Sequence, residues 1–301
     1  MLIDGSKMEG GGQVVRVASA ISALLGISIR INKIRAGRSK PGLAAQHAAG
    51  LKLVAALCSG VLQDCKIGSD SILLEPRKIS SGTSFMADAV TAGSCTLLLQ
   101  SVLPCCVVRD DERAIHVVLR GGTNVAFSPP IDYTIHVALP LMRRLTGMEA
   151  SVSLKRRGFF PRGGGEITLT VSPKERLAAF RMLERGDVVE LQGIVLGSEQ
   201  TLKELQSSLL QTLREEPALG NLSLQLSQEV IAASVSSAAV VIWAKTEGGC
   251  VLGASALSEK RVNPHQLAGQ AVESLRESLS HGGCVDEHMQ DQANSFASSC
   301  A

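Results

Sequence analysis

Apolar and polar residues follow two different periods along the first 85 residues. The stretch 13–25 is apolar at every third or fourth position, which predicts a helix, and Gly26 is placed to end it. The stretch 27–34 alternates apolar and polar residues as a half-buried strand does. The remaining elements expected in this part are a helix over 43–58 and short strands over 63–67 and 71–74. Helices and strands therefore alternate in one α/β unit.

A second unit with the same plan is expected from about residue 91. Small residues at 91–94 open an apolar helix over 95–106, and the strand 115–119 runs into a glycine loop at 121–124. A helix near 132–145 and strands on either side of 163–165 complete it. The two passes share architecture rather than side-chain identity, so we predict an α/β (α+β) fold whose large domain consists of repeated βαβαββ-like units.

The pattern changes after about residue 180. A strand is expected over 187–196, an amphipathic helix over 201–213, two strands over 238–244 and 250–254, and a helix over 264–279 before a third glycine turn at 281–283. We therefore predict a catalytic domain over 1–180, an inserted small α/β domain over 181–280 and the start of a third repeat unit over 281–301. The last helix before residue 280 is compatible with either of the first two domains.

Composition narrows the class of protein. Of the 301 residues, 45% are hydrophobic but only 3% aromatic, so aliphatic side chains must build the core and few rings are left to stack on bases. A net charge of +2 excludes a general polyanion binder, although basic residues gather over 30–40 and 143–162. The eight cysteines form no C-x-x-C pair, and no signal peptide or membrane span is evident. We expect a soluble protein of the cytosol or the nucleus.

A glycine turn near the N-terminus is the first candidate for chemistry. Gly10, Gly11 and Gly12 precede a helix, so the backbone could approach phosphate oxygens and present unpaired N–H groups to them. Glu9 stands beside this turn and could hold Mg²⁺ (or Mn²⁺) against the phosphates. A tight strand-to-helix turn and a surface carboxylate explain the same residues, and both alternatives stay open.

Basic and polar residues gather at the same kind of position. Arg35 and Arg38 are spaced so that one turn could direct both guanidinium groups at a phosphate, and Gln46 and His47 open the next helix. With Arg16, they fall where strand ends meet helix starts, the edge at which α/β proteins bind ligands. An exposed basic loop and a structural histidine are the alternatives.

The motifs around these residues closely resemble those of the RNA 3'-terminal phosphate cyclases, in the family's order along most of the chain. The matching segments are Glu9-Gly-Gly-Gly-Gln13 with Arg16, 33–39, 41–43, 91–94, 120–124, 158–166 and 281–287. The resemblance implies a large domain of repeated α/β units, shared with the enolpyruvate transferases, and a smaller α/β domain inserted late.

The resemblance also implies an ATP-dependent, ligase-class activity that closes an RNA 3'-phosphate onto its 2'-hydroxyl through enzyme-AMP and RNA-AMP intermediates, as in nuclear RNA processing. Glu9 would hold the metal. Arg16, Arg35, Arg38, Gln46 and His47 would receive the RNA end. The positions that match the nucleotide site of the family are Gln100, Pro129, His288, Asp291 and Gln292. His288 departs from the pattern, because the family has an aromatic residue there that packs on adenine.

The segment after Gln292 departs from the family pattern. The family's AMP-accepting histidine lies downstream of the part that matches 291–292, and residues 293–301 resemble no continuation of it. None of the six histidines (47, 116, 136, 265, 281 and 288) occupies that position. We therefore expect that the chain as written does not form the adenylylated enzyme. A shortened cyclase product and a protein that keeps the fold for binding alone are the two explanations.

Two other functions compete with a cyclase. A non-catalytic RNA-binding factor of ribosome assembly would resemble the cyclase-like branch of the superfamily, but that branch departs at the first glycine turn and at the Arg-Ala-Gly-Arg loop, which are intact here. An enolpyruvate transferase shares only the fold-level analogy.

Overall fold

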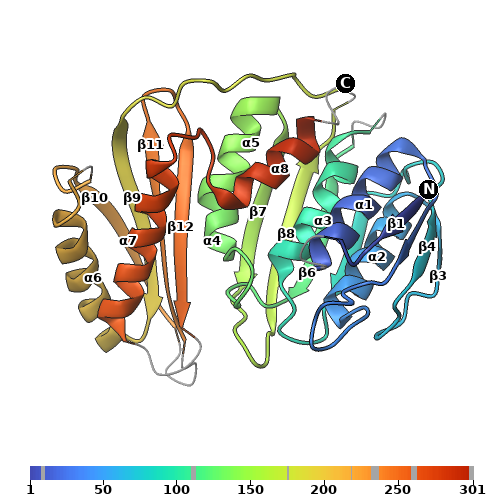
Figure 1. The fold of residues 1–301 in the computed structure, drawn as a ribbon, viewed down its shortest axis with the longest axis horizontal. Coiled ribbons are helices and arrows are strands. Elements are labelled where there is room, and N and C mark those ends of the chain that lie inside the picture. The colour runs from blue at the N-terminus through green and yellow to red at the C-terminus, as the bar shows by residue number, and fades with distance from the viewer. Residues whose placement is uncertain are drawn as a thin grey trace. The chain divides into compact units, whose positions relative to one another are not determined.

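The computed structural model describes residues 1–7, 11–109, 113–174, 176–217, 219–231, 237–258 and 263–297 (Figure 1). The chain forms two compact units. The first consists of the described residues of Met1–Thr123 and Thr146–Ala179 with those from Asn294 on, and the second of those of Asn124–Leu145 and Phe180–Ala293. We describe each unit by itself.

The first unit contains two four-stranded mixed sheets with the same strand order. Their strands are, in spatial order, β1 (Leu2–Asp4), β2 (Ile29–Asn32), β4 (Ile72–Glu75) and β3 (Val61–Gln63), and then β5 (Ser84–Asp88), β6 (Ile115–Gly121), β8 (Gly165–Ser172) and β7 (Glu149–Arg156). In each sheet the first two strands are parallel and the other pairs are antiparallel. The predicted repeat of architecture is confirmed.

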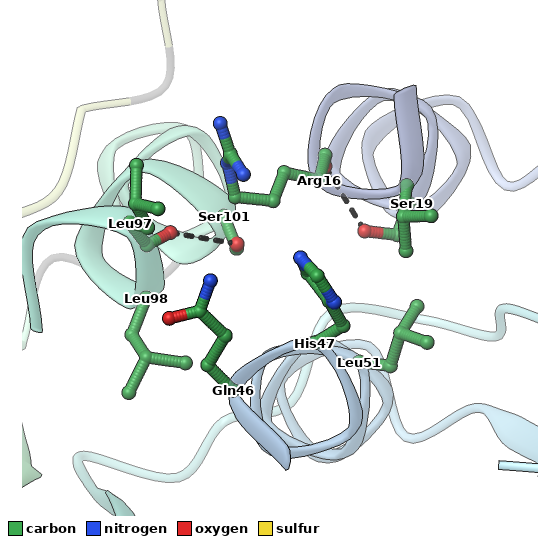
Figure 2. Close-up of a pocket in the computed structure, with 9 residues that line it drawn as sticks. Arg16, Ser19, Gln46, His47, Leu51, Leu97, Leu98 and Ser101 are labelled. Atoms are coloured by element: carbon green, nitrogen blue, oxygen red, sulfur yellow. Dashed lines mark hydrogen bonds between the residues drawn. The ribbon is translucent and has the colours of Figure 1, made fainter. Parts of the chain in front are cut away.

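Three helices of this unit pack against one another: α1 (Gly12–Leu25), α2 (Ala45–Leu57) and α3 (Cys95–Val107). Helix α1 contacts β2 of the first sheet, and α3 contacts β6 and β8 of the second. Helix α2 contacts both sheets, at β3 and β5. Strand β2 buries Ile29 and Ile31 and exposes Arg30, as an alternating strand with one covered face does. The N-terminal halves of the three helices meet at a small cavity (Figure 2).

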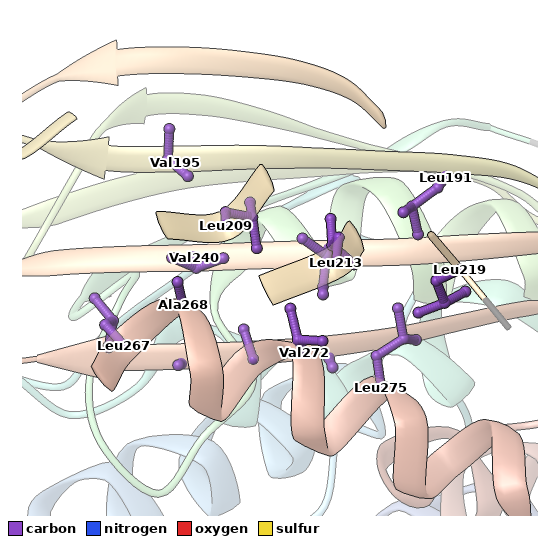
Figure 3. Packing of buried hydrophobic residues seen from close by; sticks show 14 of the residues in the cluster. Leu191, Val195, Leu209, Leu213, Leu219, Val240, Leu267, Ala268, Val272 and Leu275 are labelled. Atoms are coloured by element: carbon purple, nitrogen blue, oxygen red, sulfur yellow. The ribbon is translucent and has the colours of Figure 1, made fainter. Parts of the chain in front are cut away.

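The second unit contains one mixed sheet with a different order. Its strands are, in spatial order, β10 (Leu224–Val230), β9 (Val188–Gly197), β11 (Ala238–Thr246) and β12 (Val251–Ser258). Helices α6 (Glu199–Arg214) and α7 (Pro264–Ser280) pack on the sheet and on each other (Figure 3). Leucines three or four residues apart, at 202, 205, 209 and 213, form the buried face of α6.

Short helical segments lie mainly in the second unit. They are α4 (Ile131–Tyr133), the π-helix η1 (Thr134–Ala138), α5 (Leu139–Thr146) and α8 (Glu287–Ala297). Both α4 and η1 contact β12. Asp286 immediately precedes α8 and accepts hydrogen bonds from the backbone N–H groups of His288 and Met289, both at 3.0 Å. This carboxylate satisfies two of the donors that a helix start leaves unpaired.

The predicted elements match the observed ones with a few differences. The strand expected over 63–67 lies at Val61–Gln63, because Asp64 adopts a left-handed φ of 58° that turns the chain away. Strands β1, β5 and β10 and helix α8 were not predicted. In the described part of the chain, no helix is both long enough and apolar enough to cross a membrane.

Candidate phosphate-binding site

The candidate site is built on the first turns of three helices. Helix α1 begins after Gly11, which offers no side-chain cap, and its first turn has no acidic residue. The first turns of α2 and α3 also lack acidic residues. Backbone N–H groups in a first turn have no partner within the helix, and the helix dipole places partial positive charge there. The site therefore favours an anion.

Arg16 extends from α1 into the space between the helices (Figure 2). Burial lowers the pKa of its guanidinium from 12.5 to about 10, and within the described residues the group has neither a hydrogen-bond acceptor nor a carboxylate partner. The cavity that it lines measures about 10 Å³, with Gln46 and His47 from α2 and Ser101 from α3. A cation that has lost water without gaining a partner is suited to receive an anion.

His47 is buried against the start of α1. Its Nδ1 accepts a hydrogen bond from the backbone N–H of Ala44 at 3.2 Å, so the neutral ring carries its proton on Nε2. A Cβ atom on Gly12 would lie 2.1 Å from that Nε2, so only glycine permits this approach. Burial first, and then the charges of Arg35 and Arg16, lower the pKa of His47 from 6.5 to about 4. The ring is therefore a neutral donor at pH 7.

Gln46 connects α2 to the start of α3. Its Oε1 accepts a hydrogen bond from the backbone N–H of Ser94 at 2.9 Å. Ser94 caps α3, since its Oγ accepts from the N–H of Leu97 at 3.3 Å. The amide group of Gln46 therefore fixes the two helix starts relative to each other.

Three glycine motifs contact one another through their backbones. They are the segments 91–94, 120–124 and 158–166. The N–H of Gly122 donates to the carbonyl of Gly93, and the N–H of Thr123 donates to the carbonyl of Gly158, both at 2.8 Å. Gly121 has a φ of 155°, and a Cβ atom there would lie 2.2 Å from the Gly93 carbonyl oxygen. Segments far apart in the sequence therefore form one cluster of loops.

Of the two loop arginines, one braces the loop and the other reaches the helix start. Arg35 has a left-handed φ of 53°, and its Nη1 donates to the carbonyl of Gly42 at 2.9 Å. Arg38 is exposed, and its Nη2 would lie 3.4 Å from a Cβ atom on Gly11. Arg38 and His47 thus flank the same first turn of α1. Glu9 and Gly10 lie outside the described residues.

The predicted nucleotide residues are divided between the two units. Gln100 lies on α3 of the first unit, next to Ser101, while the other four belong to the second unit. Pro129 is buried two residues before α4, and Gln292 is partly buried on α8. Asp291 also lies on α8, but its side chain is not among those described.

His288, in the first turn of α8, has a defined aromatic partner. Its ring meets the ring of Tyr133 edge to face, with centroids 5.2 Å apart. The Tyr133 hydroxyl donates to Asp286 at 2.6 Å, and the N–H of Gly253 donates to the same carboxylate at 2.8 Å. The sequence prediction did not name Tyr133 or Asp286 as a site residue, although Asp286 falls in the matching segment 281–287. Two polar residues in apolar surroundings were a signal that could have found them.

The cysteines are unsuited to chemistry at this site. The seven described cysteines are all free, and burial raises the pKa of the Cys106 thiol to about 12. Such buried thiols are not nucleophiles at neutral pH. Among the described residues, no group of three or more histidine, cysteine, aspartate or glutamate side chains is placed to hold a metal ion.

The geometry defines a mixed α/β protein with repeated βαβαββ units and a cationic pocket at helix starts. Its sequence matches the family RNA 3'-terminal phosphate cyclase over residues 7–299. It is 35% identical over 301 residues to the RNA 3'-terminal phosphate cyclase of Ignicoccus hospitalis, covering 98% of this chain and 84% of that protein. It is 34% identical to the probable RNA 3'-terminal phosphate cyclase of Dictyostelium discoideum, covering 96% and 68% of the two chains.

The chain therefore belongs to the RNA 3'-terminal phosphate cyclase family, whose members are ATP-dependent enzymes.

Proposed function

We propose that the pocket between the three helices binds the 3'-phosphate end of an RNA, with ATP as the second substrate. The observation that carries this proposal is Arg16, a partly desolvated guanidinium without a carboxylate partner among the described residues, beside first turns that lack acidic residues. Because the cavity has room for about one water molecule, the phosphate lies at its mouth and not inside it.

The reaction that this site serves is the closure of an RNA 3'-phosphate into a 2',3'-cyclic phosphodiester. AMP is transferred from ATP to the 3'-phosphate with loss of pyrophosphate. The neighbouring 2'-oxygen then attacks the 3'-phosphorus, its proton is lost, and AMP leaves. A phosphate monoester alone would have to expel a very poor leaving group, so activation by AMP supplies the driving force. In the family, AMP first occupies a histidine nitrogen, which divides the transfer into two steps.

Each residue of the pocket has a part in holding the RNA end. Arg16 and Arg38 neutralise charge on the phosphoryl oxygens, and Arg35 keeps the loop that carries Arg38 in place. The protonated Nε2 of His47 donates to a phosphate oxygen or to the ribose only if its ring turns from Gly12. Gln46 holds the start of α3.

The nucleotide and the metal are assigned to positions that the family resemblance supplies. We assign the adenosine of ATP to Pro129, His288, Asp291 and Gln292 of the second unit, and Gln100 stays a prediction of the resemblance. Glu9 would hold Mg²⁺ or Mn²⁺ against the phosphates, where the metal neutralises charge. We also propose that 181–280 is an inserted domain and that the protein acts in the nucleus or cytosol on RNA.

Binding of matched RNA oligonucleotides tests the proposal. The chain should bind an oligonucleotide with a 3'-phosphate more tightly than the same oligonucleotide with a 3'-hydroxyl. Arg16→Met keeps the aliphatic stem and should lower that preference about 10-fold or more, because a charge-assisted hydrogen bond is lost. Arg30→Met removes an exposed arginine from β2 and serves as the matched control.

The rival function predicts a different result in the same assay. A non-catalytic cyclase-like RNA-binding factor has no reason to distinguish the two RNA ends. Equal affinity of the wild-type chain for both oligonucleotides would therefore contradict our proposal and favour that alternative.

A further inference from the structure

Phe127 combines two unfavourable features in one residue. Its side chain is fully exposed, with a relative accessibility of 103%, and its backbone has a left-handed φ of 61°. A single exposed apolar side chain needs no explanation, but a bulky residue in the left-handed region is a conformational outlier. Glycine at this position would remove both costs.

The loop around Phe127 is anchored on both sides. Asn124 is buried and donates from Nδ2 to buried Asp132 at 3.2 Å. The hydroxyl of Ser128 donates to the carbonyl of Val125 at 3.0 Å, and Val125 is itself buried. Pro129 is buried as well. The ring is therefore held out into solvent by an ordered turn.

Among the described aromatic side chains, Phe127 is the most exposed. Phe160 is about half exposed, and Tyr133, Phe159 and Trp243 are buried. In a chain with so few aromatic residues, a ring presented on a fixed turn offers both of its faces to a flat apolar group. Unpaired nucleobases are such groups and stack on aromatic side chains whatever their sequence.

The position of the turn favours a nucleobase as the partner. Phe127 lies two residues before Pro129, one of the positions that we assign to the adenosine of ATP. We propose that Phe127 stacks on an unpaired nucleobase, supplied either by the RNA or by ATP. This inference rests on the proposed function, because it takes its two candidate bases from those substrates.

Three variants and one control test the stacking. Phe127→Gly should weaken binding of either the oligoribonucleotide or ATP about 5- to 100-fold, as expected for one lost stacked base. The same variant should melt at an equal or higher temperature than wild type, because strain is removed. Phe127→Tyr should restore binding. Leu183→Gly, at another exposed apolar residue outside the helices and strands, should leave binding unchanged.

Phe127→Trp identifies the source of the base. If adenine stacks on the new indole, its fluorescence should fall when ATP is added. If an RNA base stacks on it, the fluorescence should fall when the oligoribonucleotide is added. Stacking does not involve the terminal phosphate. Phe127→Gly should therefore lower the affinity for 3'-phosphate RNA and for 3'-hydroxyl RNA by the same factor. Failure of the proposed function would instead appear in wild type as the absence of any preference between these ends.

Three results would overturn the inference. One is wild-type affinity of Phe127→Gly for both ligands. Another is indole fluorescence that responds to neither ligand. The third is a change in oligomeric state of Phe127→Gly on size-exclusion chromatography, which would assign the ring to a contact between copies of the chain.

Discussion

At the scale of single residues, His47 links the candidate site to pH. Its pKa falls from 6.5 to about 4 on folding, mainly through burial. Between these pH values the unfolded chain binds the proton and the folded chain does not. The contribution of neutral His47 to the free energy of unfolding is therefore complete above about pH 6.5 and is lost as the pH falls toward 4. The difference between the two pKa values corresponds to a loss of about 3 kcal/mol in the free energy of unfolding at and below about pH 4.

Denaturant unfolding of His47→Gln between pH 7 and pH 4.5 tests this expectation. Glutamine at the third position of a helix can still reach back to the N–H of Ala44, but it does not titrate. The variant should therefore lose less stability than wild type as the pH falls. His116→Gln, at an exposed histidine, should behave as wild type. Equal pH dependence in all three proteins would show that His47 is not the group responsible.

Val90 is a second strained residue, beside the loop 91–94. This β-branched residue has a φ of 63° and is 83% exposed. We predict that Val90→Gly stabilises the protein by about 1 kcal/mol, because relief of left-handed strain exceeds the added chain entropy. Val61→Gly, in β3, should destabilise it instead. Denaturant unfolding distinguishes the two, and a loss of stability in Val90→Gly would contradict the assigned strain.

At the scale of elements, hydrophobic periodicity was enough to predict a helix or strand where one face of that element is covered. Helices α1, α2 and α3 were predicted to within two residues at either end, and Gly26 ends α1 with a φ of 67°, as expected. Strand β10 was missed, although Leu224 and Leu226 alternate with polar residues. Strand β1 is too short, at three residues, for any period to appear.

Helix α8 could not be found from periodicity, because its start depends on a long-range hydrogen-bond network. Asp286 accepts bonds from Tyr133 and from the N–H groups of Gly253, His288 and Met289. Tyr133 lies 153 residues away in the sequence, so no local pattern contains this information. The network couples α4, β12 and α8.

We predict that Tyr133→Phe destabilises the second unit by about 1–2 kcal/mol, because one buried oxygen of Asp286 loses a donor. Asp286→Ala should cost more, about 3 kcal/mol, since it also removes the cap of α8. Amide hydrogen exchange should speed up in the first turns of α8 in both variants and remain slow in α2. Unchanged exchange in α8 would show that the network does not hold this helix.

At the scale of the whole molecule, the residues of the candidate site could be named from the sequence, but the distances between them could not. It predicted that Arg16, Arg38 and His47 serve one ligand, and the structure places Arg38 and His47 at the same turn of α1. It could not show that Arg35 binds its own loop, or that motifs at 91–94, 120–124 and 158–165 pack together, because backbone contacts between distant segments leave no periodic trace.

The covalent step can be tested on the whole chain. The histidine in the pocket, His47, has Nδ1 bonded to the N–H of Ala44 and Nε2 against Gly12. A ring nitrogen must be free to attack the α-phosphorus of ATP. We therefore predict that His47 does not accept AMP: after incubation with α-labelled ATP and Mg²⁺ and denaturation, peptide mapping should find no acid-labile label on the peptide that contains His47. Label on that peptide would refute this. RNA that already carries AMP on its 3'-phosphate bypasses this step, so faster cyclisation of that RNA by wild type than by Arg16→Met would show that the pocket still promotes ring closure.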